Sequence, residues 1–253
     1  MSIKHAFIQK QGRELQFEEK IVANELQARG IPISFFTKKN IHRRNLALDE
    51  STLVVGDVNS VYGAIKQLNK DVPIANCYPD ILRPYLHRHA EKSTIKELRR
   101  RFQDEFDTTP VFAKPFGKHK EFIGRVFQSQ ADLYVVNHLS RHTDIWLISP
   151  INFVSEFRVY VIDGEILSVS YIDGDATKVV DINVVEKAIF AYESTSDKYS
   201  GYAIDFGCTD DDKTALIELN EGFSIGAYEP IEPEQYCNLL ISRWLQLMSQ
   251  PAT

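Results

Sequence analysis

A strand-like stretch near the end of the sequence, "TALIELNEG" at residues 214–222, carries two side chains that could bind a cation. Its apolar residues alternate, so Glu218 and Asn220 lie two positions apart on the other face of a pleated strand. A carboxylate and an amide therefore present oxygen atoms side by side. The alternative is the solvated polar face that half-buried antiparallel sheets commonly have.

The preceding stretch, "GYAIDFGCT", supplies a third oxygen ligand. It alternates in the same way, and the charged residues 210–213 that follow it predict a hairpin loop. Pairing of Thr209 with Thr214 then puts Asp205 directly opposite Glu218. Two carboxylates that face each other across a sheet repel, and a bound divalent cation would reverse that effect. Mg²⁺ suits the three oxygens, because it takes one or two carboxylates and completes its shell with water and phosphate.

A basic, glycine-containing turn forms the second chemically informative stretch, "PVFAKPFGKHKEFIGRVF". A strand ends at Lys114, a loop with Gly117 follows, and the apolar pattern resumes after Gly124. The order of residues is not that of a Walker A loop. Two ammonium groups, Lys114 and Lys120, flank the turn and predict a polyphosphate site. A basic hairpin without a ligand is the alternative.

An arginine on a predicted strand is the third candidate. In "SEFRVYVIDGEILSVSYI" the dipeptide Asp163-Gly164 predicts a hairpin, and Glu156 and Arg158 lie two apart on one face of its first strand. A guanidinium fixed on a strand presents a rigid fork that suits phosphate or carboxylate. The alternative is a structural pair of Glu156 with Arg158 on the sheet surface.

The elements around these stretches predict an α/β front portion and a β-rich back portion. Strand patterns "HAFIQ", "IPISFF" and "STLVVG" alternate with helical patterns at 14–29 and in "VNSVYGAIKQLN", which indicates a small parallel sheet flanked by helices. Thr94 and Glu97 predict a capped helix. We expect a domain boundary near residue 92, with domains at 1–92 and 93–253.

Composition limits the classes of partner. The 253 residues are 43% hydrophobic and 25% charged, as in a soluble globular protein with one large or two smaller domains. The net charge of −6 gives no reason to expect a nucleic-acid or membrane partner. The N-terminus lacks the apolar segment of a secretory signal, and Cys77, Cys208 and Cys237 read as reduced core thiols. We therefore expect a cytoplasmic protein.

Taken together and in this order, the features resemble the ATP-grasp superfamily. A lysine-bearing strand with a glycine loop, an apolar hinge, an acidic-x-Arg strand, and an Asp followed thirteen residues later by Glu-x-Asn form the pattern of its nucleotide-binding half, here about residues 93–247. The phrases "KPFGKHKEFIG", "LISPINFVSEFRVYV" and "ELNEGFSIGAYEP" further resemble a divergent bacterial and phage clade. That clade is related to the eukaryotic cell-division protein that assists assembly of a translation initiation factor.

The resemblance implies an α+β ATP-grasp fold, in which two α+β subdomains sandwich ATP after a small α/β pre-ATP-grasp domain. The lysine-loop subdomain would span about 93–145 and the metal-platform subdomain about 146–250. Lys114 would hold the α- and β-phosphates, Lys120 would close on the phosphate chain, and Arg158 would meet the γ-phosphate and later an acyl phosphate. The hinge at 146–149 would receive adenine. It ends in Ser-Pro where many members carry an acidic residue, so the ribose contact is unassigned.

The residues assigned by this resemblance fall into three groups. Those for the nucleotide are Lys114, Lys120, Trp146, Leu147, Ile148, Ser149, Glu156 and Arg158; those for catalysis are Lys120 and Arg158; those for one or two Mg²⁺ ions are Asp205, Glu218 and Asn220.

The implied activity is that of an ATP- and Mg²⁺-dependent ligase. ATP would phosphorylate a carboxylate, and an amine would displace phosphate from the acyl intermediate to form an amide or peptide-type bond, with a protein or peptide among the candidate substrates. Two alternatives stay open: a nucleotide-binding assembly factor without ligase chemistry, and a small-molecule kinase on the same scaffold. A new amide, unchanged ATP and a phosphoester, respectively, would identify the three.

Overall fold

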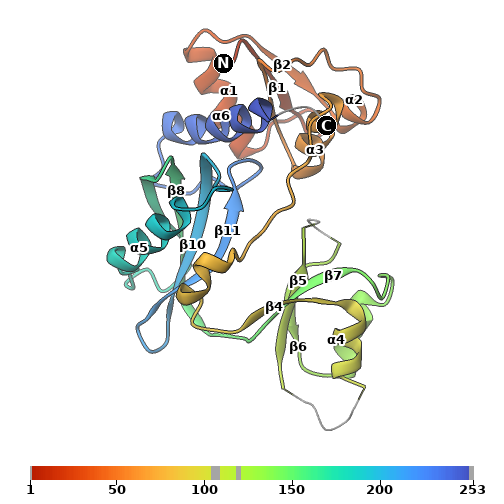
Figure 1. The fold of residues 1–253 in the computed structure, drawn as a ribbon. Helices are drawn as coiled ribbons and strands as arrows, with labels where there is room; N and C mark the ends of the chain where they lie inside the picture. Colours follow the sequence, from red (N-terminus) through yellow and green to blue (C-terminus); the bar gives the residue numbers. More distant parts are fainter. Residues whose placement is uncertain (1, 104–108, 118–120, 251–253) are drawn as a thin grey trace.

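The computed structural model describes residues 2–103, 109–117 and 121–250. Figure 1 shows three sheet-containing bodies that follow one another in space, with the chain running from the first body to the third and back. The sheets have the strand orders β2-β1-β3, β11-β10-β8-β9 and β4-β7-β5-β6. We call these bodies the N-terminal body, the platform and the lysine sheet.

The N-terminal body is the small parallel sheet with flanking helices that the sequence predicts. Both β1–β2 and β1–β3 pair in parallel. Gly30 ends α1 at a φ of +71°, a conformation that glycine adopts without strain. The elements are β1 (His5–Gln9), α1 (Phe17–Ala28), β2 (Ile33–Phe36), α2 (Lys38–His42), β3 (Thr52–Val55) and α3 (Val58–Gln67).

The core of the N-terminal body is completed by a distant part of the chain. Helix α6 (Pro233–Ser249) packs along α1, as Figure 1 shows. Leu240, Trp244 and Leu247 of α6 share one buried cluster with residues of β1 and β3. The division of the chain at residue 92 stays a prediction, since that residue lies inside strand β4 (Ala90–Thr94) of the lysine sheet.

The lysine sheet is antiparallel and holds Lys114 near the end of a strand. Lys114 on β5 pairs with Trp146 on β7 in the observed register. Thr94 caps α4, because its side chain accepts a hydrogen bond from the backbone N–H of Glu97 at 3.4 Å. The remaining elements are α4 (Ile95–Arg101), β5 (Val111–Pro115), β6 (Arg125–Phe127), the 3₁₀ helix η2 (Gln130–Val136) and β7 (Asp144–Ile148).

The platform is a four-stranded antiparallel sheet with α5 against it. The predicted hairpin at Asp163-Gly164 is confirmed, and both residues have positive φ, as a type I′ turn requires. Helix η1 precedes β4 in the chain and packs against α5 and β11. The elements are η1 (Asp80–Tyr85), β8 (Phe153–Ile162), β9 (Glu165–Gly174), α5 (Ile182–Glu193), β10 (Gly201–Thr209) and β11 (Thr214–Glu221).

The register of β10 with β11 confirms that Asp205 lies opposite Glu218. The hairpin end differs from the prediction, because Thr214 pairs with Cys208 rather than with Thr209. A β-bulge after Asp205 takes up the difference and leaves Ile217 without a partner residue. Uniform alternation in a sequence cannot reveal such an insertion.

Buried thiols and helix lengths agree with the composition. All three cysteines are buried and free, as predicted. No helix in the described part of the chain combines the length and the apolar character that a membrane crossing requires.

Candidate active site

Three predicted site residues form one row across the platform. Arg158 on β8 lies opposite Asp205 on β10, which in turn lies opposite Glu218 on β11. Asn220 stands two residues beyond Glu218, and its Nδ2 donates to Asp205 Oδ2 at 2.9 Å. The structure therefore brings together the charge fork and all three predicted metal ligands.

Arg158 and Asp205 form a two-pronged ion pair. Nε and Nη2 of Arg158 donate to the two carboxylate oxygens of Asp205, each at 2.8 Å. Only 4% of Asp205 is exposed. Burial raises the pKa of Asp205, and the Arg158 guanidinium opposes that rise. The fork geometry makes this one of the stronger classes of hydrogen-bonded pair.

Lys114 reaches the same row from the lysine sheet. Its ammonium forms an ion pair with Glu218 and lies 4.7 Å from the centroid of the Tyr78 ring. Burial opposes the charge on Lys114, but Glu218 outweighs burial and raises the pKa of Lys114 well above its ordinary value. Burial likewise raises the pKa of Glu218, and Lys114 reverses that effect, so the net pKa is lowered.

These pairings correct one expectation from the sequence. The two facing carboxylates are not left to repel each other, because Arg158 and Lys114 each neutralise one of them. Neither cation could be assigned to its carboxylate from local spacing, since Lys114 and Glu218 are 104 residues apart.

Replacing Asp205 by alanine should therefore destabilise the metal-free protein. The change leaves the Arg158 guanidinium, whose side chain is 12% exposed, without its carboxylate. Loss of one partner from a largely buried pair should lower the free energy of unfolding by about 3 kcal/mol. Urea unfolding in a chelator measures it, with Asp210→Ala in the exposed hairpin loop as the control. Unchanged stability would show that the pair contributes nothing.

A cavity of about 390 Å³ lies between the lysine sheet and the platform. Lys114 and Glu218 stand on its wall, and Phe112 and Val126 add apolar surface. Its volume falls within the range of small-molecule and cofactor sites. This cavity is where the predicted nucleotide site lies in the structure.

The predicted adenine hinge needs a correction. Ile148 and Ser149 line the cavity, but Trp146 and Leu147 do not, and both are buried in the cores on either side of β7. Trp146 packs edge-on against Tyr78 with ring centroids 5.0 Å apart. Successive side chains of a strand point to opposite faces, so a run of apolar residues cannot all face one ligand. The cavity wall continues instead into the loop 150–153.

Glu156 stands on the cavity wall near the row. The alternative pairing of Glu156 with Arg158 is not observed, because Arg158 forms its ion pair with Asp205. Burial raises the pKa of Glu156, and the neighbouring carboxylates Asp205, Asp173 and Glu218 raise it further. Lys120, the other predicted catalytic residue, lies outside the described residues.

Arg88 is a wall residue whose role the sequence did not indicate. Its guanidinium donates to the backbone carbonyl oxygens of Leu216 and Ile217 at 2.7 and 3.0 Å. These carbonyls lie at the β-bulge, where the regular ladder is interrupted. Arg88 therefore holds the strand that carries Glu218. Its only signal in the sequence was an arginine in the segment before the lysine sheet.

A family model decides the family of this chain. The model, described as an ATP-grasp domain and as family 2 of its clade, matches residues 85–239. The chain belongs to this ATP-grasp family. Membership confirms the predicted superfamily and fold, with ATP and Mg²⁺ as cofactors and an ATP-dependent ligase as the enzyme class at the level of the family. The link to the eukaryotic cell-division protein stays a prediction.

Solved structures share the ATP-grasp fold over nearly the whole chain. D-alanine–D-alanine ligase from Bacillus anthracis is 14% identical over 98% of this chain and 99% of its own, with a TM-score of 0.59. D-cycloserine synthetase DcsG is 11% identical over 95% and 99%, with a TM-score of 0.60. ATP-grasp ligase PsnB, complexed with a minimal precursor, is 12% identical over 96% and 99%, with a TM-score of 0.56. The comparison with curated proteins found no match.

Proposed function

We propose that this ATP-grasp protein joins a carboxylate to an amine through an acyl phosphate. The observation that carries the proposal is the row of Arg158, Asp205 and Glu218 at the edge of a nucleotide-sized cavity, with Lys114 facing it from the other sheet. Two cations and a set of oxygen ligands are what a transferring phosphoryl group requires.

The reaction divides into two steps. A carboxylate oxygen attacks the γ-phosphorus of ATP, the bond to the β,γ-bridging oxygen breaks, and ADP leaves. The amine nitrogen then attacks the acyl carbon, the bond from that carbon to the phosphate oxygen breaks, and inorganic phosphate leaves. The ammonium form of the amine gives up two protons in all, one to phosphate and one to solvent. Lys114 binds the phosphates that ATP and ADP share, and Arg158 stabilises the group in transfer.

The donor set on the platform fits Mg²⁺. Asp205 and Glu218 offer carboxylate oxygens in neighbouring positions, and Asn220 offers an amide oxygen on the same face. Hard oxygen ligands of this kind, one or two of them carboxylates, suit Mg²⁺ at a phosphate site. When bound, Mg²⁺ neutralises charge on the β- and γ-phosphates.

A protein or peptide is the substrate class that the comparisons support. PsnB has been solved with a minimal precursor and with precursor peptide PsnA2. In both structures its resemblance covers 96% of this chain. We include a peptide carboxylate or amine among the substrates on that basis.

The Glu218→Gln variant tests the metal site. It keeps the shape of the side chain but removes the charge, so Mg²⁺-dependent binding of a non-hydrolysable ATP analogue should weaken by about tenfold or more. Calorimetric titration with and without Mg²⁺ measures the difference. Glu165→Gln, at the exposed start of β9, is the control. Equal Mg²⁺ dependence in both variants would remove Glu218 from the metal site.

Product analysis tests the reaction itself. Incubation with ATP, Mg²⁺ and pools of carboxylates, amines and peptides should yield ADP, phosphate and a new amide detectable by mass spectrometry. A phosphoester in place of the amide would identify a kinase. ATP left intact while a protein partner binds would identify an assembly factor, and either result would overturn the ligase proposal.

A further inference from the structure

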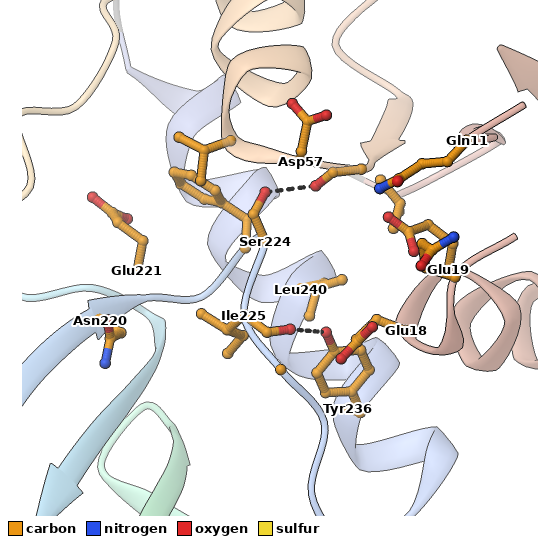
Figure 2. Close-up of a pocket in the computed structure, with 16 residues that line it drawn as sticks. Gln11, Glu18, Glu19, Asp57, Asn220, Glu221, Ser224, Ile225, Tyr236 and Leu240 are labelled. Carbon is orange, nitrogen blue, oxygen red and sulfur yellow. Dashed lines mark hydrogen bonds between the residues drawn. The ribbon is translucent and has the colours of Figure 1, made fainter. Parts of the chain in front are cut away.

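A second cavity of about 440 Å³ lies between the N-terminal body and the end of β11. Figure 2 shows its walls, which come from α1, the end of β3, α6 and the loop after β11. Two hydrogen bonds hold that loop in place: Ser224 Oγ donates to the Gly56 carbonyl at 2.6 Å, and Tyr236 Oη donates to the Ile225 carbonyl at 2.5 Å. The cavity is therefore a formed feature of the fold.

This cavity adjoins the phosphoryl-transfer row. Asn220 lines it while donating to Asp205. Gly226 also lines it, and the Gly226 carbonyl accepts hydrogen bonds from Arg158 Nη1 at 3.4 Å and from Tyr160 Oη at 2.7 Å. Glu218 faces the nucleotide cavity and Asn220 the second one, so two consecutive parts of β11 serve the two cavities. A group bound in the second cavity lies beside the site of transfer.

The second cavity is strongly acidic. Its described lining includes four carboxylates and no lysine, arginine or histidine. Two of the carboxylates have cations outside the cavity, since Asp57 pairs with Lys38 and Glu221 with Arg243. The other two, Glu18 and Glu19 on α1, have no ion pair within the described residues. Figure 2 shows the carboxylates arranged around the cavity.

Glu19 supplies an observation independent of the charge count. It is only 8% exposed and lines the cavity, and no described side chain donates a hydrogen bond to its carboxylate. Burial raises the pKa of Glu19 against the opposing effect of its own backbone N–H, with Glu18 and Asp57 adding to the rise. A second buried oxygen on the wall, Oε1 of Glu221, has no hydrogen-bond partner in the described structure. Buried acceptors that no other residue satisfies indicate a ligand that donates.

The spacing of these carboxylates favours an organic cation over a metal ion. Within the described residues, no three acidic, histidine or cysteine side chains converge closely enough to hold a metal. The apolar walls from Phe223, Ile225 and Leu240 also suit an alkyl chain.

We propose that the second cavity binds the amine substrate as a cation, with an alkylammonium group held by Glu19 and Glu18. The placement of this substrate beside Arg158 rests on the proposed ligase function, but the binding of the cation does not. The substrate class is thus a basic amine, such as a diamine or a lysine-like side chain, rather than an amine that carries a nearby carboxylate.

The test measures binding without turnover. The probes are 1,5-diaminopentane, 1-pentanol and pentanoate, which share a five-carbon chain and differ in charge. Ligand-observed NMR titration in the presence of ADP and Mg²⁺ should give affinity in the order diamine, alcohol, carboxylate. Glu19→Gln should weaken diamine binding by about tenfold, as expected for loss of a charge-assisted contact.

Two further variants keep the result interpretable. Glu18→Gln should weaken the diamine in the same direction, and it remains informative if Glu19→Gln does not fold. Glu14→Gln, an exposed residue of the same body that does not line the cavity, should leave binding unchanged. Equal affinity for pentanoate and the diamine, or equal loss in the Glu14 control, would overturn the proposal. Displacement of the diamine by Mg²⁺ with the same Glu19 dependence would overturn it in favour of a metal.

The outcome separates this inference from the ligase proposal. Glu19-dependent diamine binding with no amide from any carboxylate would leave the cation site standing and remove the ligase reaction. Amide formation only with neutral or acidic amines would leave the ligase standing and remove the cation site.

Discussion

The Arg158→Ala variant should lose turnover by on the order of 10² or more while keeping its affinity for ADP within a few-fold. Arg158 stands over the row where the γ-phosphoryl group is transferred, and removal of one preorganised charge-stabilising group typically costs this much. ADP lacks the γ-phosphate, so its binding should depend little on this arginine. Calorimetric titration with ADP and a turnover assay with an identified substrate pair measure the two effects.

Lys114→Ala should behave differently, because Lys114 faces phosphates that ATP and ADP share. We expect weaker binding of both nucleotides. Because Arg158→Ala leaves Asp205 unpaired, Arg158→Lys serves as a second variant that keeps the charge and loses the fork. Both proteins are checked for folding by circular dichroism first. An equal loss of ADP affinity in the Arg158 and Lys114 variants would sink this division of roles.

The Arg243→Ala variant should be the least stable of the single substitutions. Arg243 on α6 and Glu221 on β11 form an ion pair whose side chains are 3% and 4% exposed, and Arg243 also donates to Gln246 at 2.6 Å. Removal of one partner leaves a buried, uncompensated carboxylate. We expect a loss of about 3–5 kcal/mol in the free energy of unfolding.

Chemical denaturation of the metal-free protein measures this loss. The double variant Arg243→Met with Glu221→Leu is the matched comparison, because replacing both charges by apolar groups of similar size is often neutral. It should recover most of the stability that Arg243→Ala loses. A double variant as unstable as the single one would show that packing around α6, rather than the unpaired charge, determines the effect.

Local patterns predicted the elements of the site well, and pairing between distant elements was beyond them. Alternation and a four-residue loop were enough to place Asp205 opposite Glu218, because register follows from the hairpin. The order of motifs identified the fold. The hinge was predicted too broadly, since four consecutive residues of a strand cannot all face one cavity, and Trp146 and Leu147 lie in the cores.

The parts that the sequence did not predict depend on long-range contacts. Lys114 with Glu218 joins two sheets, and Arg88 binds the bulge across 128 residues. The acidic cavity combines Glu19 near the start of the chain with Glu221 near its end. Each of these residues lies in an ordinary amphipathic pattern, so nothing local distinguishes it. Tertiary folding alone brings the pairs together.

The packing of α6 into the N-terminal body sets an order of events during synthesis. Leu240, Trp244 and Leu247 complete a core whose other half lies in the first three strands and helices. The intervening 165 residues, 68–232, take on the order of 10 s to translate. Over that interval the nascent N-terminal body exposes the apolar surface that α6 later covers. The first part of this protein to leave the ribosome is thus among the last to reach its native state, and chaperones that bind exposed apolar surface have their longest access there.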